Sequence, residues 1–68
     1  MKPNISLIEV IDNALKYNSC IRIAKDCNRF YAYVSGRGFT RRHWKSQVRL
    51  AKDIREAGFT GTIIVEKS

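Results

Sequence analysis

The sequence predicts one small α+β domain whose elements follow in the order α-β-β-α-β. Three observations predict it: two segments with apolar residues at helical spacing, one pair of alternating segments around a short turn, and the β-branched run Ile63-Ile64-Val65. The composition is globular, because 44% of the 68 residues are hydrophobic and only one is proline. We expect residues 1–68 to form a single domain, a three-stranded sheet with two helices packed on one face.

The first helix is predicted to begin at Ser6, with Asn4 as an alternative cap, and to end near Asn18. Ser6 and Glu9 have the spacing of a capping box, in which the serine hydroxyl accepts the amide of residue 9. Asn18 tolerates the left-handed conformation that often ends a helix. The expected buried stripe consists of Leu7, Ile8, Ile11, Ala14 and Leu15.

The second and third elements are predicted to form a hairpin, residues 20–25 and 29–34, with a two-residue turn at Cys27-Asn28. The register that this turn imposes separates two faces. One face is apolar except at its rim and pairs Ile21 with Val34, Ile23 with Ala32, and Lys25 with Phe30. The other face is aromatic and basic and pairs Arg22 with Tyr33, Ala24 with Tyr31, and Asp26 with Arg29. A sheet with one buried face has this pattern.

Residues 35–39 are predicted to form a loop, and Thr40 is the expected cap of a long helix that reaches Ala57. Gly58 is a suitable stop residue, after which Phe59 can fold back onto Ile54. The expected buried stripe of this helix consists of Trp44, Val48, Ala51, Ile54 and Ala57, with Leu50 beside it. Residues 60–66 are the last strand, and we expect the first hairpin strand to lie in the middle of the sheet.

Positive charge is concentrated in the middle of the chain. The net charge is +7, yet residues 19–52 alone hold nine basic side chains against one acid, Asp26, for a net charge of +8. On the predicted long helix, one basic row would consist of Arg41, Lys45, Arg49 and Lys52. Basic residues near a helix N-terminus oppose the helix dipole, so we interpret Arg41 and Arg42 as residues kept for binding an anionic partner. The loop around Arg37 would add exposed amides that suit a phosphate.

Catalysis and metal binding are not expected from this sequence. His43 is the only histidine and has no serine or cysteine at a spacing that predicts contact. Cys20 and Cys27 are too few for a zinc site or a disulfide framework, and they suggest a reducing, cytoplasmic location. No stretch approaches the ~20 apolar residues of a membrane span. We therefore predict a non-enzymatic protein without a cofactor or metal.

Two functions fit this pattern. The first is a small nucleic-acid-binding module, for DNA or RNA, whose phosphate contacts come from the basic loop and helix: Arg37, Arg41, Arg42, Lys45, Arg49 and Lys52. A second surface on the hairpin would consist of Arg22, Arg29, Tyr31 and Tyr33. The alternative is a protein-interaction or inhibitory module, of the type found as accessory proteins of phages and plasmids, which binds an acidic protein surface. A homodimer is compatible with either function.

Overall fold

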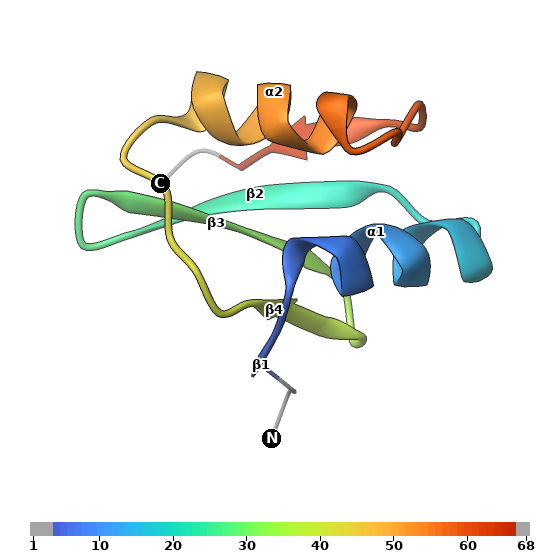
Figure 1. Ribbon diagram of the computed structural model, residues 1–68. Coiled ribbons are helices and arrows are strands. Elements are labelled where there is room, and N and C mark those ends of the chain that lie inside the picture. The colour runs from blue at the N-terminus through green and yellow to red at the C-terminus, as the bar shows by residue number, and fades with distance from the viewer. Residues whose placement is uncertain (1–3, 67–68) are drawn as a thin grey trace.

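The computed structural model describes residues 4–66 and has two layers, a mixed sheet and a pair of helices (Figure 1). The elements in chain order are β1 (Asn4–Ile5), α1 (Leu7–Lys16), β2 (Ile21–Asp26), β3 (Arg29–Val34), β4 (Gly38–Thr40), α2 (Gln47–Glu56) and β5 (Ile63–Val65). The α+β class is therefore confirmed. The ends of the predicted domain, residues 1–3 and 67–68, lie outside the described residues.

The sheet has more strands than the sequence predicted. Its order is β1-β4-β3-β2-β5, in which β1 is a two-residue strand at one edge. The first hairpin strand, β2, lies between β3 and β5 as expected, antiparallel to β3 and parallel to β5. The prediction of three strands in the order α-β-β-α-β is wrong because β4 and β1 were not recognised. These strands pair with each other in parallel, and β4 also pairs antiparallel with β3.

The hairpin forms in the predicted register. Arg22 pairs with Tyr33, Ala24 with Tyr31, and Asp26 with Arg29. Cys27 and Asn28 both have positive φ, at 49° and 64°, which a two-residue turn between twisted strands requires. The alternation of the two strands therefore assigns each side chain to one face of the sheet.

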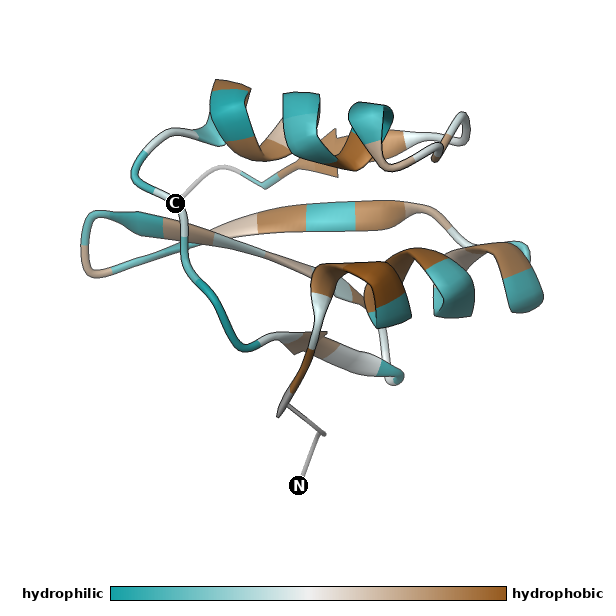
Figure 2. Ribbon diagram, in the orientation of Figure 1, coloured by the Kyte–Doolittle hydropathy of each residue, from teal (hydrophilic) through white to brown (hydrophobic). Residues whose placement is uncertain are grey.

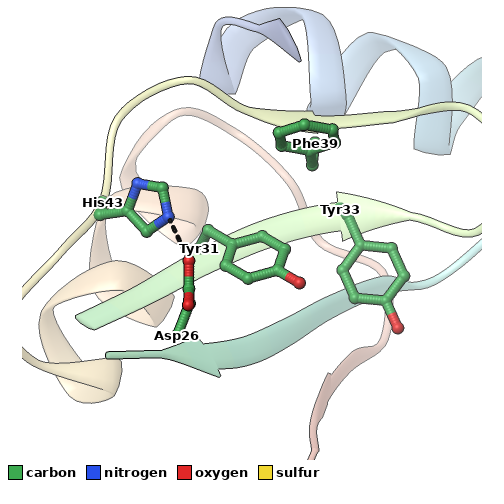
Figure 3. A pocket seen from close by; sticks show the side chains of 5 residues that line it. All are labelled: Asp26, Tyr31, Tyr33, Phe39 and His43. Carbon is green, nitrogen blue, oxygen red and sulfur yellow. Dashed lines mark ion pairs between the residues drawn. The ribbon is translucent and has the colours of Figure 1, made fainter. Parts of the chain in front are cut away.

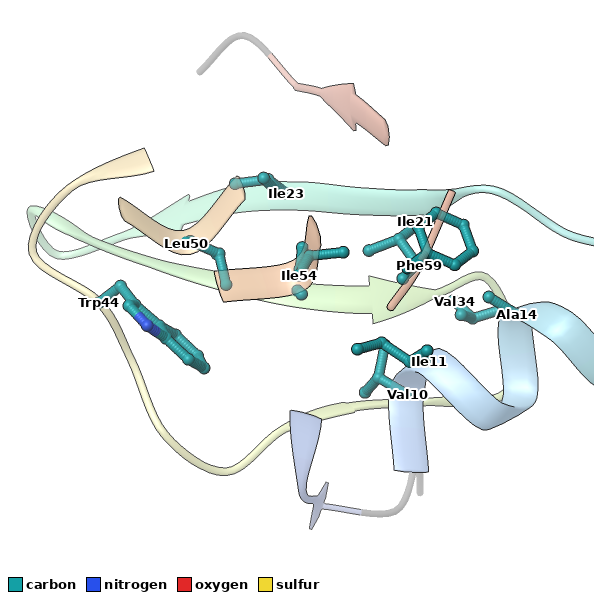
Figure 4. Packing of buried hydrophobic residues seen from close by; sticks show 11 residues of the cluster. Val10, Ile11, Ala14, Ile21, Ile23, Val34, Trp44, Leu50, Ile54 and Phe59 are labelled. Atoms are coloured by element: carbon teal, nitrogen blue, oxygen red, sulfur yellow. The ribbon is translucent and has the colours of Figure 1, made fainter. Parts of the chain in front are cut away.

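Both helices cover the same face of the sheet and enclose the core (Figures 1, 2 and 4). Helix α1 begins as predicted, because the Ser6 hydroxyl accepts the Glu9 amide at 3.3 Å, and Asn18 follows it with φ 50°. The core cluster consists of Val10, Ile11, Ala14, Ile21, Ile23, Ala32, Val34, Trp44, Leu50, Ile54 and Phe59. The predicted α1 stripe is only half buried, since Ile8 and Leu15 are each 59% exposed.

Residues 38–46 depart most from the prediction. The expected helix start at Thr40 is wrong, because the Thr40 hydroxyl accepts the Ala32 amide at 3.2 Å inside the sheet. The chain then runs beside β3, where Phe30 and Trp44 exchange two backbone hydrogen bonds of 2.7 Å. Ser46 is the actual N-cap, and its hydroxyl accepts the Arg49 amide.

Helix α2 is consequently shorter than predicted, and its buried side is narrower. Leu50 and Ile54 are fully buried, whereas Val48 is 73% exposed and Ala57 is also exposed. Trp44 is buried, but from the preceding segment, where its indole Nε1–H donates to Asp53 at 2.8 Å. The end of α2 follows the prediction, because Gly58 has φ 104° and the Phe59 amide donates to the Ile54 carbonyl.

Candidate functional site: the aromatic open face of the sheet

The sheet face opposite the helices, here called the open face, is aromatic. The register places Arg22, Tyr33 and Phe39 side by side across β2, β3 and β4. Tyr31 lies on the same face, two residues before Tyr33. These side chains are partly exposed, whereas their neighbours along the strands, such as Ile23 and Ala32, are fully buried under the helices. One face of the sheet therefore forms the core and the other meets solvent.

Tyr31 is at the centre of a cluster of four rings (Figure 3). Its ring centroid lies 6.0 Å from that of Tyr33, 6.1 Å from that of Phe39 and 5.5 Å from that of His43. The Phe39 ring meets Tyr31 edge-on, and the other two rings are tilted, as aromatic pairs prefer. Together with Asp26, these four residues line a depression of about 390 Å³.

His43 reaches the open face from the segment between β4 and α2. Its Nε2 lies 3.7 Å from a carboxylate oxygen of Asp26, at the end of β2. His43 is partly buried and Asp26 is exposed, so the pair sits at the rim of the depression.

At the other side of the face, Glu66 contacts two sheet residues. The Tyr33 hydroxyl donates to a Glu66 carboxylate oxygen at 2.7 Å, and Arg22 lies 3.8 Å from the same oxygen. Burial raises the pKa of Tyr33 above its ordinary value, and the hydrogen bond to Glu66 and the charge of that carboxylate raise it further. The residue after β5 is thereby held on the aromatic surface.

The structure separates the ten predicted binding residues. The hairpin set stays together: Arg22, Tyr31 and Tyr33 lie on the open face, and Arg29 pairs with Asp26 at its end. The predicted helical row of Arg41, Lys45, Arg49 and Lys52 does not form, because α2 begins only at Gln47. Only Arg49 and Lys52 are on the helix, and Arg49 lies 3.9 Å from Asp53.

Of the remaining predicted cations, Arg37 directly precedes β4, Arg41 and Arg42 directly follow it, and Lys45 is exposed in the segment before α2. Arg37 stacks on the Tyr17 ring, 3.9 Å from its centroid, next to the end of α1. Arg42 covers the Trp44 ring at 4.9 Å, and it lines a depression together with Arg41 beside the start of α1. The predicted phosphate site at a helix N-terminus is wrong, because the loop around Arg37 leads into strand β4 rather than into a helix. Arg41 and Arg42 therefore do not oppose a helix dipole.

Sequence reasoning missed three residues of this surface, Phe39, His43 and Glu66. Phe39-Thr40 carried a signal, because both are strand formers, but the adjacent Gly36 and Gly38 favoured a loop. The unfavourable position of Arg41 and Arg42 in the predicted helix was a second signal. The position of these two arginines is explained by the true start of α2 at Gln47 and is not a sign of binding. His43 and Glu66 reach the face through contacts between distant segments, which no local pattern predicts.

Three further findings concern metal binding, membrane-spanning helices and similarity to known proteins. No three histidine, cysteine or acidic side chains among residues 4–66 are grouped so as to hold a metal ion. No helix within this part of the chain is long and apolar enough to cross a bilayer. The chain matches no protein-family model, no curated protein sequence and no solved structure at a significant level. The surface is therefore interpreted from its own geometry.

Proposed function

We propose that this protein binds single-stranded nucleic acid on the open face of its sheet. The observation that carries the proposal is the cluster of Tyr31, Tyr33, Phe39 and His43 on the solvated side of the sheet. Unpaired bases stack on such aromatic side chains, and each stacked base contributes about 1–3 kcal/mol. A duplex keeps its bases stacked inside and cannot use this surface in the same way.

The net charge of the whole chain, rather than the local charge of the open face, supports an anionic ligand that spans the platform. Arg22 and Arg29 lie on or beside the open face, and the chain as a whole carries a net charge of +7. A backbone that crosses the rings would place phosphates near these cations and within the field of the whole molecule. The binding is therefore expected to weaken as the salt concentration rises.

We further propose that the protein acts by binding and not by catalysis. His43, the only histidine of the sequence, approaches the Asp26 carboxylate at an open rim. Cys20 and Cys27 are both free thiols, which suits a cytoplasmic location.

A protein partner is the second candidate, and one observation favours it. The acids Asp26 and Glu66 lie beside Arg29 and Arg22, so the local charge of the open face is nearly balanced. Tyrosine and arginine are also common anchors of protein interfaces. This candidate would use the same rings and would not need an anionic ligand.

The test is a binding titration with labelled single-stranded and duplex oligonucleotides, DNA and RNA, at low and moderate salt. We expect the single strands to bind more tightly, and we expect the affinity to fall as salt rises. Tyr31→Ala should weaken binding by about tenfold or more, since it removes the central ring. Tyr17→Ala is the matched control, because Tyr17 is an exposed tyrosine beside α1, away from the open face.

Two results would contradict the proposal: equal loss of affinity in the Tyr31→Ala and Tyr17→Ala variants, or no binding of any oligonucleotide at low salt. Capture of a protein that survives nuclease treatment, lost in Tyr31→Ala alone, would favour the second candidate.

A further inference from the structure

The helix layer holds most of the exposed apolar side chains of the described residues. Five large hydrophobic side chains are exposed among residues 4–66, and four of them lie on or next to the two helices: Ile8, Leu15, Tyr17 and Val48. Val65 on β5 is the fifth. Ile8 and Leu15 are seven residues apart and lie on the same side of α1, so this side of the helix presents apolar surface to a partner.

The exposed sides of the two helices are similar in spacing and opposite in charge. On α1, Ile8, Asp12 and Leu15 follow one another at helical spacing, so a carboxylate lies between two apolar side chains. On α2, Val48, Lys52 and Arg55 have the same spacing, and two of the three are basic. Asp12, the single carboxylate of the α1 stripe, is therefore opposite in sign to Lys52 of α2, whereas the Arg55 guanidinium donates to the carbonyls of Phe59 and Gly61.

The two helices leave room between them. A depression of about 590 Å³ is lined by residues from the start of α1, the segment 41–44 and α2, with Leu7 and Trp44 as its apolar part. Asp53 and Glu56 of α2 line it together with Arg41 and Arg42. Side chains of both signs of charge therefore line this depression together with Leu7 and Trp44.

We propose that a second copy of this chain docks here, helix layer against helix layer, with α1 of each copy against α2 of the other. In a dimer with a two-fold axis, α1 of the first copy contacts α2 of the second, and α2 of the first copy contacts α1 of the second. The same contact between opposite charges is therefore made twice. The described chain measures 30 × 28 × 19 Å, so its broad face is large enough for a standard interface of about 800 Å² per partner.

The dimer would also supply apolar burial that a chain of 68 residues lacks on its own. Both open faces would point outward and remain accessible. This inference does not depend on what the open face binds.

The test is the molar mass in solution, by light scattering and sedimentation over a range of protein concentrations. We expect a molar mass of twice 7.9 kDa at high protein concentration, and we expect the dimer to dissociate on dilution. Asp12→Lys and Lys52→Asp should each weaken dimerisation by at least about tenfold, because each brings like charges together. The double variant restores opposite charges and should dimerise again. Recovery in the double variant separates a lost contact from a lost fold.

Ile8→Ser with Leu15→Ser should also yield a monomer whose circular dichroism is unchanged, whereas Tyr31→Ala on the open face is the control that should leave the dimer intact. A chain that stays monomeric up to millimolar concentration would overturn the proposal. So would a dimer that tolerates every helix variant and is lost in Tyr31→Ala, since its interface would then be the open face.

Discussion

The two faces of the sheet are formed by the same strands but differ in how far their side chains are exposed to solvent. On the covered face, Ile21, Ile23 and Ala32 have no exposed surface, and Val34 has 1%. On the open face, Arg22, Tyr31 and Tyr33 keep part of their surface in solvent. The burial of these side chains under two helices stabilises the folded protein. The open face has large rings that are not part of the core, which is why we propose that it is the binding surface.

The largest expected effect is on the covered face. Phe59→Ala removes one of the largest fully buried side chains, and such changes cost about 3–5 kcal/mol. A chain of this size seldom has more than about 3–5 kcal/mol of stability, so the variant should be mostly unfolded at room temperature. Urea denaturation followed by circular dichroism measures this. Thr60→Ala, at an exposed position directly after Phe59, should change the free energy of unfolding by no more than about 0.5 kcal/mol.

A smaller loss of stability is expected where the segment 41–46 attaches to α2. Asp53→Ala leaves the buried Trp44 indole N–H without its acceptor, which costs about 1–3 kcal/mol. Asp53→Asn keeps an acceptor and should cost less. Arg49→Ala controls for the exposed Arg49–Asp53 ion pair, which contributes little. Equal stability of the Asp53→Ala variant and the unsubstituted protein would show that this hydrogen bond does not hold the segment in place.

On the open face, a substitution should affect binding more than folding. Phe39→Ala removes a partly exposed ring that meets Tyr31 edge-on, a contact worth about 0.5–1.5 kcal/mol. If a base also stacks there, affinity for a single strand should fall by about 1–3 kcal/mol, a factor of five to a hundred or more. Denaturation and titration of the same sample compare the two losses. A stability loss with unchanged affinity would remove Phe39 from the binding surface.

The smallest expected effect is the pH dependence that Tyr33 contributes. Its pKa is raised in the folded state, chiefly by burial and then by Glu66, so the folded chain holds this proton more tightly than the unfolded chain. The resulting stability is complete below the ordinary tyrosine pKa of about 10 and is lost as the pH rises through the folded value. Glu66→Gln should move this pKa toward its ordinary value. Ultraviolet absorbance of tyrosinate, compared with Tyr33→Phe, measures the titration; an unchanged curve in Glu66→Gln would contradict the assignment.

The features that the sequence predicted correctly depend on local rules. The hairpin register follows from alternation and the Cys27-Asn28 turn, and the start of α1 follows from the Ser6 cap. The hairpin part of the candidate site, Arg22, Tyr31 and Tyr33, was found in the same way.

The features that were missed depend on contacts between distant residues. Strand β4 exists because Gly38–Thr40 pairs with both β3 and β1, which the turn-forming glycines concealed. The segment before α2 is extended because Trp44 bonds to Phe30, fourteen positions earlier. Phe39 and His43 reached the site only through these pairings, and the basic row was lost for the same reason.

The most direct test of the binding role is an amide chemical-shift map of the isotope-labelled protein during titration with a single-stranded oligonucleotide. The proposed site predicts shifts along β2, β3 and β4 and at His43, with α1 and α2 largely unchanged. Shifts confined to the two helices, with Tyr31, Tyr33 and Phe39 unaffected, would contradict it.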